Sequence, residues 1–166
     1  MGKKLILDTS AIISGKPFPT DVETFTIQSV INEIKLNKEY YPVLENIKIL
    51  EIDNESLKKA IETAKKTGIF EKLSKTDLEL ISAAIKYKYT VVTDDYAIQN
   101  VLKFLNLEYM TFSQEGIKDV YIWVYKCKGC KRIYKKNYIN CPYCGSELIL
   151  TRLKKKNKKS EIFKIQ

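Results

Sequence analysis

Four cysteines, all that the chain contains, lie as two CxxC pairs in one short C-terminal segment. Cys127 and Cys130 form the first pair, and Cys141 and Cys144 form the second. A CxxC turn directs two thiolates at one ion, and two such turns complete a tetrahedral four-cysteine site of the kind that binds structural zinc. Gly145 follows the second pair and can take the positive φ that such a turn favours. We therefore predict that all four cysteines bind one Zn²⁺ in a small zinc ribbon.

Two disulfides, or a redox-active CxxC, are the alternatives for this pattern. Disulfides are rare in cytosolic proteins. The N-terminal apolar stretch is too short for a signal peptide, so a cytoplasmic location is expected. No apolar run approaches the roughly 20 residues of a membrane-spanning helix, so no membrane partner is expected. A redox pair would not need a second CxxC. Because a site with four cysteine ligands leaves no ligand position open, this zinc is predicted to stabilise the fold rather than to catalyse.

Upstream of the cysteines, strand patterns alternate with helical patterns. Strands are expected at 4–7, 23–27, 47–52, 90–93 and 109–112. Helices are expected from an N-cap at Ser29, over 55–66, from Ser74 or Thr76, and over 96–105. This alternation predicts an α/β fold with a mostly parallel sheet flanked by helices. We expect three parts: an α/β domain over 1–115, the β-rich zinc ribbon over 116–153, and a disordered basic tail over 154–166.

The charge of the chain is concentrated in its C-terminal part. Its net charge is +9. Residues 1–118 carry 16 Lys and Arg against 17 Asp and Glu, whereas residues 119–166 carry 13 against 3. This asymmetry predicts a polyanionic partner, with nucleic acid ahead of a membrane surface. The alternative is that a lysine-rich surface serves solubility or heat tolerance.

Basic and aromatic residues alternate around the cysteines. Basic side chains can contact phosphates, and aromatic rings can stack on unpaired bases. Each tyrosine taken singly is better explained by packing in a very small domain, whereas the basic face as a whole favours RNA binding. The predicted RNA-binding residues are Lys126, Lys128, Lys131, Arg132, Lys135 and Lys136, and the interleaved tyrosines are Tyr125, Tyr134, Tyr138 and Tyr143.

The chain contains no histidine. Histidine general bases, nucleophile partners and metal ligands are therefore excluded. Hydrolytic chemistry would have to use carboxylates, metal ions, lysine or cysteine. No pattern in the sequence predicts a small-molecule substrate.

Acidic residues stand at positions where an α/β sheet forms its sites. Asp8 follows the first expected strand, and Asp94 and Asp95 follow the strand at 90–93. Glu33 lies in the helix opened by Ser29, and Asp77 lies in the first turn of the helix that starts at Ser74 or Thr76. Strand ends and helix starts meet at one edge of a parallel sheet. Clustered carboxylates select Mg²⁺ or Mn²⁺, and one or two such ions can activate water for phosphodiester cleavage. Singly, each acid could instead be a cap, a turn residue or a surface charge.

The ordered set of acids resembles that of a PIN domain. The matching segments run over 5–10, 29–34, 73–84 and 91–96. Together with the CxxC pairs, they resemble the NOB-type endoribonucleases of ribosome biogenesis, in a compact archaeal-like form. The resemblance implies that Asp8, Glu33, Asp77 and one or both of Asp94 and Asp95 are catalytic residues that bind Mn²⁺ or Mg²⁺ as cofactor. It also implies that Thr9, Ser10 and Thr93 orient these carboxylates.

This resemblance implies a function and leaves alternatives open. It implies metal-dependent cleavage of single-stranded precursor RNA at the 3′ end of small-subunit rRNA, with the pre-ribosomal particle as partner. One alternative is a PIN toxin acting on tRNA or mRNA, which would generally lack a zinc ribbon. Another is a non-catalytic rRNA-binding assembly factor, against which the intact acidic set argues. The choice between Asp94 and Asp95 as the fourth acidic ligand stays open.

Overall fold

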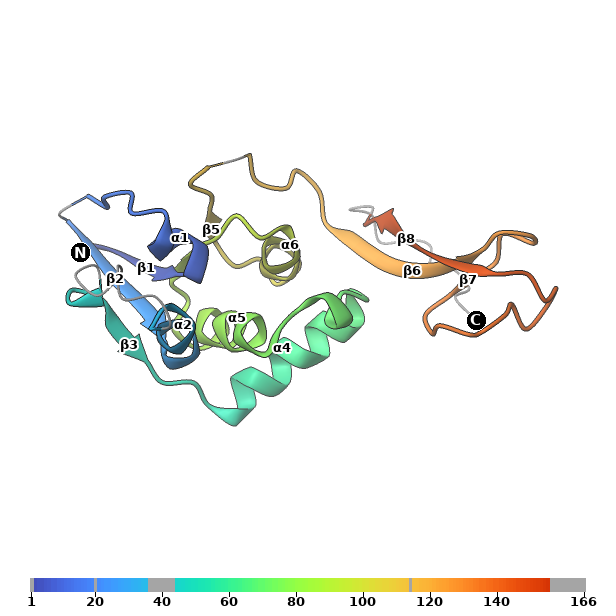
Figure 1. Ribbon diagram of the computed structural model, residues 1–166, viewed down its shortest axis with the longest axis horizontal. Helices are drawn as coiled ribbons and strands as arrows, with labels where there is room; N and C mark the ends of the chain where they lie inside the picture. The colour runs from blue at the N-terminus through green and yellow to red at the C-terminus, as the bar shows by residue number, and fades with distance from the viewer. Residues whose placement is uncertain (1, 20, 36–43, 114, 156–166) are drawn as a thin grey trace.

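The computed structural model describes residues 2–19, 21–35, 44–113 and 115–155 (Figure 1). It contains a five-stranded sheet and a three-stranded sheet. The predicted mixed α/β architecture with a small β-rich appendage is confirmed. The five-stranded sheet consists of β1 (Lys3–Leu7), β2 (Val22–Ile27), β3 (Lys48–Leu50), β4 (Thr90–Val92) and β5 (Tyr109–Met110).

All neighbouring strands of the five-stranded sheet run parallel, in the order β3-β2-β1-β4-β5. The chain first builds outward from β1 to β3, then returns to place β4 on the other side of β1. The strand order therefore reverses between β1 and β4. Open α/β sheets form their binding crevice beyond the carboxyl ends of the strands at such a reversal. Asp8 follows β1 and Asp94 follows β4, so both lie at this crevice.

Helices cover the sheet and complete its core. The central helix α5 packs against β1, β2 and three other helices. Its buried face consists of apolar and small residues such as Leu80, Ile81 and Ala84, which join one continuous core with the strands. The helices are α1 (Thr9–Ile13), α2 (Gln28–Ile34), α4 (Asn54–Lys66), α5 (Lys75–Tyr87) and α6 (Tyr96–Phe104), with a short 3-10 helix η2 (Phe70–Lys72).

Two helix starts differ from expectation. The segment after Asp8, for which no helix is expected, forms the short helix α1, and Asp8 is its N-cap. Ser29, expected as an N-cap, lies inside α2, which begins one residue earlier and has no side-chain cap. The Ser29 hydroxyl is buried without a hydrogen-bond partner among the described residues. The continuation of β2 into α2 decides this start, because the apolar residues of α2 must reach the core.

The C-terminal sheet places a central strand between two others. Strand β6 (Tyr121–Cys127) pairs antiparallel with β7 (Ile133–Tyr134) on one side and with β8 (Leu148–Lys154) on the other. Figure 1 shows β6 and β8 extending away from the five-stranded sheet. The basic tail is predicted to begin at Lys154, which is instead the last residue of β8; residues 156–166 lie outside the described part of the chain.

The first half of β6 is docked on the α/β domain by hydrogen bonds to its own backbone groups. The N–H of Trp123 donates to the carbonyl of Thr67 at the end of α4 (2.8 Å). The Asn100 side chain in α6 pairs with both backbone groups of Tyr121, at 2.8 and 2.9 Å. Gly68 has a φ of 70°, and a Cβ there would lie 2.1 Å from the Trp123 carbonyl oxygen, so only glycine permits this approach.

No helix in the described ranges is long and apolar enough to cross a bilayer.

Candidate functional site

An open depression of 410 Å³ lies at the carboxyl edge of β1 and β4. All five predicted acidic residues line it, so the fold brings together side chains that are up to 87 positions apart. Its lining also includes Ile13 and Ser74, which sequence reasoning did not assign to the site. The complete lining is Asp8, Thr9, Ser10, Ile13, Glu33, Ser74, Asp77, Asp94 and Asp95.

Asp8 is the most buried of these acids. Its N–H donates to the Val92 carbonyl of β4 (3.1 Å), and the residue is only 8 % exposed. Its carboxylate accepts hydrogen bonds from the Thr93 hydroxyl at 2.7 Å and from the Ser10 hydroxyl at 3.2 Å. The Thr9 N–H donates to the other oxygen at 2.6 Å. Two of the three residues predicted to orient carboxylates thus contact Asp8 through their side chains.

The electrostatics of Asp8 reflect its burial. Burial raises the pKa of Asp8, the hydrogen bond from Thr93 opposes this rise, and the nearby charge of Asp77 adds to it. The net effect is a pKa above the usual value. A positive charge close to Asp8 and Asp77 would lower the pKa of both carboxyl groups.

Glu33 is connected to the same edge through the remaining predicted residue. The Thr9 hydroxyl donates to a Glu33 carboxylate oxygen at 2.7 Å. This bond joins the start of α1 to α2, and the two helices also pack against each other. Glu33 itself is exposed. The bond therefore orients the exposed Glu33 side chain at the rim of the acidic depression.

Asp77 caps the helix α5 and also lines the acidic depression. It forms a capping box with Ser74: its carboxylate accepts the Ser74 N–H (2.7 Å), and its own N–H donates to the Ser74 hydroxyl (3.1 Å). Burial raises the pKa of Asp77, the Ser74 hydrogen bonds lower it, and the charges of Asp95 and Glu33 raise it further. The capping contact thus orients Asp77 while leaving it under repulsion from its acidic neighbours.

Asp94 is engaged by the loop after β5. Its carboxylate accepts the N–H groups of Phe112 and Ser113, both at 3.0 Å, and the Ser113 hydroxyl. Burial raises the pKa of Asp94, but the hydrogen bonds from Ser113 and Phe112 outweigh it, so the net pKa is lowered. Lys16 contributes in the same direction. Asp94 is therefore stabilised as an anion by the protein itself.

Asp95 is the N-cap of α6 and accepts the N–H groups of Ala97 (2.6 Å) and Ile98 (3.3 Å) through Oδ1. Its N–H donates to the Thr93 hydroxyl (3.0 Å), which also holds Asp8. The charge of Asp95 raises the pKa of Asp77. Both Asp94 and Asp95 line the depression, and we propose Asp95 as the fourth member of the acidic set, with Asp94 holding the loop after β5.

We expect Asp95→Asn to lower the cleavage rate by roughly 10- to 100-fold more than Asp94→Asn, the scale on which supporting groups of a metal site act. Asparagine still caps a helix, so Asp95→Asn should leave the melting temperature nearly unchanged. The two rates, measured with Mn²⁺ on one RNA oligonucleotide, decide the assignment. An equal loss in both variants, or a larger loss in Asp94→Asn, would contradict it.

The acidic depression fits a divalent cation by the chemistry of its donors. Its carboxylate oxygens are hard ligands, which suit Mg²⁺ and Mn²⁺. Two of its acids, Asp8 and Asp77, have raised pKa values in part because other carboxylates are near. A cation bound here would neutralise that repulsion. The acids that line the depression and could hold it are Asp8, Glu33, Asp77, Asp94 and Asp95.

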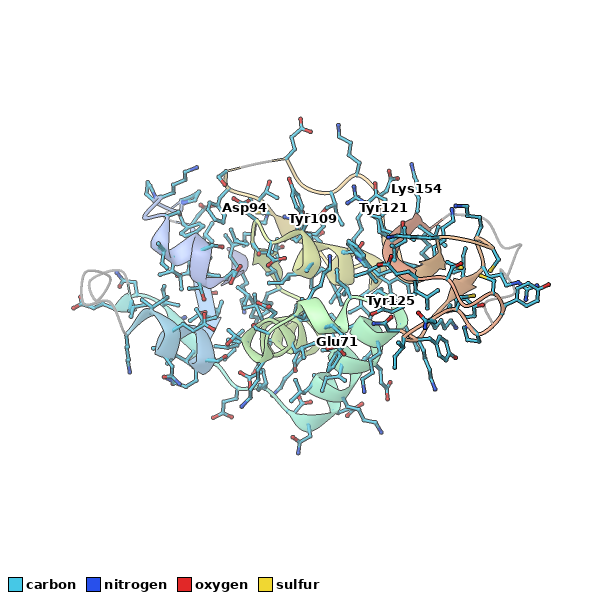
Figure 2. The ribbon with its side chains drawn as sticks, turned by 45° about the vertical axis from the view of Figure 1, so that its right-hand side comes forward. Glu71, Asp94, Tyr109, Tyr121, Tyr125 and Lys154 are labelled. Atoms are coloured by element: carbon cyan, nitrogen blue, oxygen red, sulfur yellow. The ribbon has the colours of Figure 1, made fainter. Side chains whose placement is uncertain are left out.

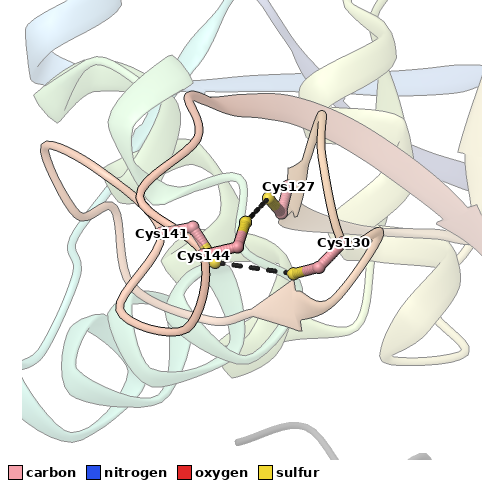
Figure 3. Close-up of side chains that lie close together, drawn as sticks. All are labelled: Cys127, Cys130, Cys141 and Cys144. Carbon is pink, nitrogen blue, oxygen red and sulfur yellow. Dashed lines mark hydrogen bonds between the residues drawn. The ribbon is translucent and has the colours of Figure 1, made fainter.

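The four cysteine thiols converge on one point (Figure 3). Their sulfur atoms all lie within 4.8 Å of one another, with Cys127 to Cys144 at 3.4 Å and Cys130 to Cys141 at 3.6 Å. Sulfurs around a tetrahedral zinc, with Zn–S of about 2.3 Å, are about 3.8 Å apart. The cluster therefore fits one zinc ion.

Each of the two cysteine turns is followed by a residue with a positive φ. Gly145 after the second pair has a φ of 75°, as predicted, and Lys131 after the first pair has a φ of 64°. The Ser146 hydrogen bonds lower the pKa of the Cys144 thiol to about 5. A low thiol pKa favours the thiolate that a metal requires. The hydrogen bonds around Cys144 thus favour its metal-binding thiolate form.

The predicted basic residues surround the cysteines in different ways. Lys128 forms an ion pair with Glu147, and the Lys131 ammonium donates to the Lys128 carbonyl (2.6 Å). The Arg132 guanidinium stacks 3.3 Å from the centroid of the Tyr143 ring, which is 65 % exposed. Lys135 and Lys136 are exposed, and Lys126 is half-buried. The basic face therefore exists on the ribbon, although its cations are not equally available.

The interleaved tyrosines divide between packing and exposure. Tyr134 is buried, and its hydroxyl lies 3.2 Å from the Cys141 sulfur. Tyr125 packs on the same small cluster. Tyr138 and Tyr143 are exposed. The sequence alone could not separate these roles, because Tyr138 and Tyr143 lie outside the strands and their exposure depends on how the loops fold around the cysteines.

Comparison with known proteins places the chain beside archaeal ribonucleases. The model of the PIN domain of ribonuclease matches residues 5–87. The chain is 37 % identical over 161 residues to Endoribonuclease Nob1 of Methanothermobacter thermautotrophicus, covering 90 % of this chain and 93 % of that protein. It is 38 % identical over 155 residues to Endoribonuclease Nob1 of Pyrococcus abyssi, covering 89 % and 92 %. It is also 38 % identical over 151 residues to Ribonuclease VapC1 of Thermoplasma acidophilum, covering 89 % and 78 %.

Proposed function

Because this chain belongs to the PIN-domain ribonucleases, with archaeal Nob1 endoribonucleases among its relatives, we propose that it matures the 3′ end of small-subunit rRNA. The chain is an endoribonuclease that acts on RNA. The finer proposal is that its substrate is a single-stranded precursor segment within the pre-ribosomal particle. Relatives that carry the name Nob1 align over nearly their whole length, including the ribbon, and this supports the proposal.

One observation carries the proposed chemistry: the acidic set converges at the β1–β4 edge of the sheet, in a chain without histidine. A divalent cation, Mn²⁺ or Mg²⁺, would activate water and stabilise the leaving oxygen of a phosphodiester when bound there. In this proposal Asp8, Asp77 and Asp95 hold the cation, and Glu33 contributes a further carboxylate. The expected products are a 3′-hydroxyl and a 5′-phosphate.

The surrounding hydroxyl groups position these carboxylates. Thr93 donates to Asp8 and accepts from the N–H of Asp95, so one side chain sets the spacing between two acids. Ser10 gives Asp8 a second hydrogen bond, and Thr9 holds Glu33. We assign these residues a positioning role. Such contacts typically contribute roughly 10- to 100-fold to metal affinity or activity.

The ribbon supplies the RNA affinity in this proposal. Its structural Zn²⁺ would be held by the cluster of four cysteines. The basic residues predicted around the cysteines would contact phosphates, and the exposed Tyr138 and Tyr143 can stack on unpaired bases. In this proposal the sheet edge cleaves the RNA and the ribbon binds it, which explains why the positive charge of the chain is concentrated after residue 118.

The test is to incubate the purified protein with Mn²⁺ and an RNA spanning the 3′ end of small-subunit rRNA and its downstream extension. We expect one dominant cut at the mature 3′ end, mapped by primer extension of a ligated adaptor. A tRNA and an unrelated mRNA of equal length serve as competitors, because the similarity to Ribonuclease VapC1 makes other RNAs the rival substrates. Preferential cutting of a competitor would refute the rRNA assignment, and tight binding without metal-dependent turnover would favour an assembly factor.

A further inference from the structure

A second cleft, of 660 Å³, lies where the ribbon meets the α/β domain. It is separate from the acidic depression, with which it shares no lining residue. Its walls come from the start of α6, from η2, from the connection 115–119 and from β6 and β8. In Figure 2, Tyr121 and Lys154 mark the end of the ribbon at this junction. A volume of this size lies within the range of about 300–1,000 Å³ that small-ligand sites occupy.

The acidic residues of this junction cleft are already paired. Glu115 forms an ion pair with Lys118 (3.4 Å), and Asp119 forms one with Lys154 (2.8 Å). The two remaining cations of its lining, Lys72 and Arg152, form no ion pair with any described residue. The cleft therefore presents two uncompensated positive charges to a ligand, and an anionic ligand is favoured.

Both of these cations are held in place by aromatic rings. The Lys72 ammonium lies 3.5 Å from the centroid of the Trp123 ring, and the Arg152 guanidinium lies 4.7 Å from that of Tyr121. Cation–π contact restricts a long side chain without neutralising it. The charges are thus positioned before any ligand arrives, which lowers the entropic cost of binding.

A third aromatic residue of the cleft exposes its ring to solvent. Tyr96 is 51 % exposed and is the first residue of α6. Its hydroxyl lies 3.5 Å from the Glu115 carbonyl oxygen, which holds the ring near the connection. An exposed ring beside two positive charges is the combination that binds single-stranded nucleic acid, with stacking for a base and cations for its phosphates.

The junction cleft adjoins the acidic depression through consecutive residues. Tyr96 lines the cleft, and Asp95, the residue before it, lines the depression. The opposite wall is anchored by the Asn100 pair with Tyr121 and by the Trp123 bond to Thr67. A strand of RNA whose phosphate lies at the acids would therefore pass directly into a preformed cleft.

We propose that the junction cleft binds one unpaired nucleotide of the RNA substrate, close to the scissile phosphate. Its base stacks on Tyr96, and its flanking phosphates contact Lys72 and Arg152. This proposal rests on the single-strand RNA substrate of the proposed function, but not on that RNA being ribosomal. It makes the junction, rather than the ribbon surface alone, a positioning site that aligns the RNA with the acids.

The test measures binding apart from cleavage. In an Asp8→Asn background, single-stranded RNAs of about 12 nucleotides are titrated by fluorescence anisotropy, each with one abasic nucleotide at a different position. We expect one position at which the abasic RNA binds roughly five- to 150-fold more weakly, the range for a lost base stack. Tyr96→Ala should weaken binding of intact RNA by a similar factor and abolish that position effect, whereas Tyr96→Phe should retain both.

The charges are tested through salt dependence. Lys72→Ala and Arg152→Ala should each reduce the slope of log Kd against log salt by roughly 0.7, the value for one single-strand phosphate contact. Lys65→Ala is the matched control, because Lys65 is also an exposed lysine over a ring, that of Phe70 at 5.2 Å, yet lies outside the cleft. It should leave the slope unchanged.

Two results would overturn the proposal. One is an abasic series with no position dependence in the Tyr96 wild type. The other is an equal loss of affinity in Tyr96→Phe and Tyr96→Ala, which would indicate a role of the hydroxyl in the fold. Because any unstructured RNA serves in this assay, failure to cut the rRNA 3′ end would leave the test of the cleft intact. Melting temperatures of all variants verify that they are folded.

Discussion

Asp8→Asn is expected to abolish RNA cleavage while leaving the fold and RNA affinity nearly unchanged. Removing one carboxylate from a cation site sacrifices several kcal/mol of transition-state stabilisation, so a loss of roughly 10³-fold, or about 4 kcal/mol, is expected. Asparagine has the same shape and can still accept the hydrogen bond from Thr93. The substitution also removes a buried carboxyl group, whose pKa is raised mainly by its burial.

The measurement is the single-turnover cleavage rate with Mn²⁺, beside the Kd and the melting temperature. Asp53→Asn is the matched control, because Asp53 is likewise a helix N-cap and accepts the Ser56 N–H (2.8 Å), but lies on α4 outside the depression. It should cleave at the wild-type rate. Wild-type cleavage by Asp8→Asn would mean that the carboxylate mechanism is wrong, whereas a lowered melting temperature would attribute the loss to folding.

Removal of zinc is expected to unfold the outer ribbon and to leave the α/β domain folded. The ribbon has its own small buried cluster of Cys127, Tyr134 and Cys141, separate from the main core. So few residues cannot stabilise a fold alone, whereas a structural zinc contributes about 10–16 kcal/mol in comparable small sites. The first half of β6 should stay in place, because Asn100 and Thr67 hold it from the α/β side.

Cys127→Ser and a strong chelator should give the same outcome. In an amide NMR spectrum, the signals of residues after about Cys127 should collapse to disordered positions while those of the sheet core persist. The RNA Kd should rise by one or two orders of magnitude, since several phosphate contacts are lost together. Adding Zn²⁺ back to the chelated wild type should restore both, and Cys127→Ser should not respond. Retention of the ribbon signals without metal would refute the structural role of zinc.

The local parts of this fold were predictable because the sequence contains their causes. The helices α4, α5 and α6 follow apolar periodicity, and their starts carry side-chain caps at Asp53, Ser74 and Asp95. The start of α2 was not predictable from its cap residue. It has no side-chain cap, and its buried face decides where it begins. Strand β8 carries no alternating pattern that separates it from the basic tail, and only pairing with β6 defines it.

By itself, the sequence determined the kinds of chemistry that this protein can perform. The absence of histidine, the two CxxC pairs and the ordered acids depend only on residue types and spacing, and they predicted carboxylate-based cleavage and a four-cysteine metal site. Only the tertiary structure decided which acids act on one another. The parallel order places β4 beside β1, so Thr93 holds Asp8, and the charge of Asp95 acts on Asp77.

The junction cleft likewise depended on tertiary structure alone. Its cations come from η2 and β8, which are 80 positions apart, and each lies on a ring from β6. No spacing rule connects such residues, because their proximity arises from how the ribbon docks on the α/β domain. A sequence specifies its local elements through short-range propensities, whereas sites between elements form only when long-range packing fixes their relative positions.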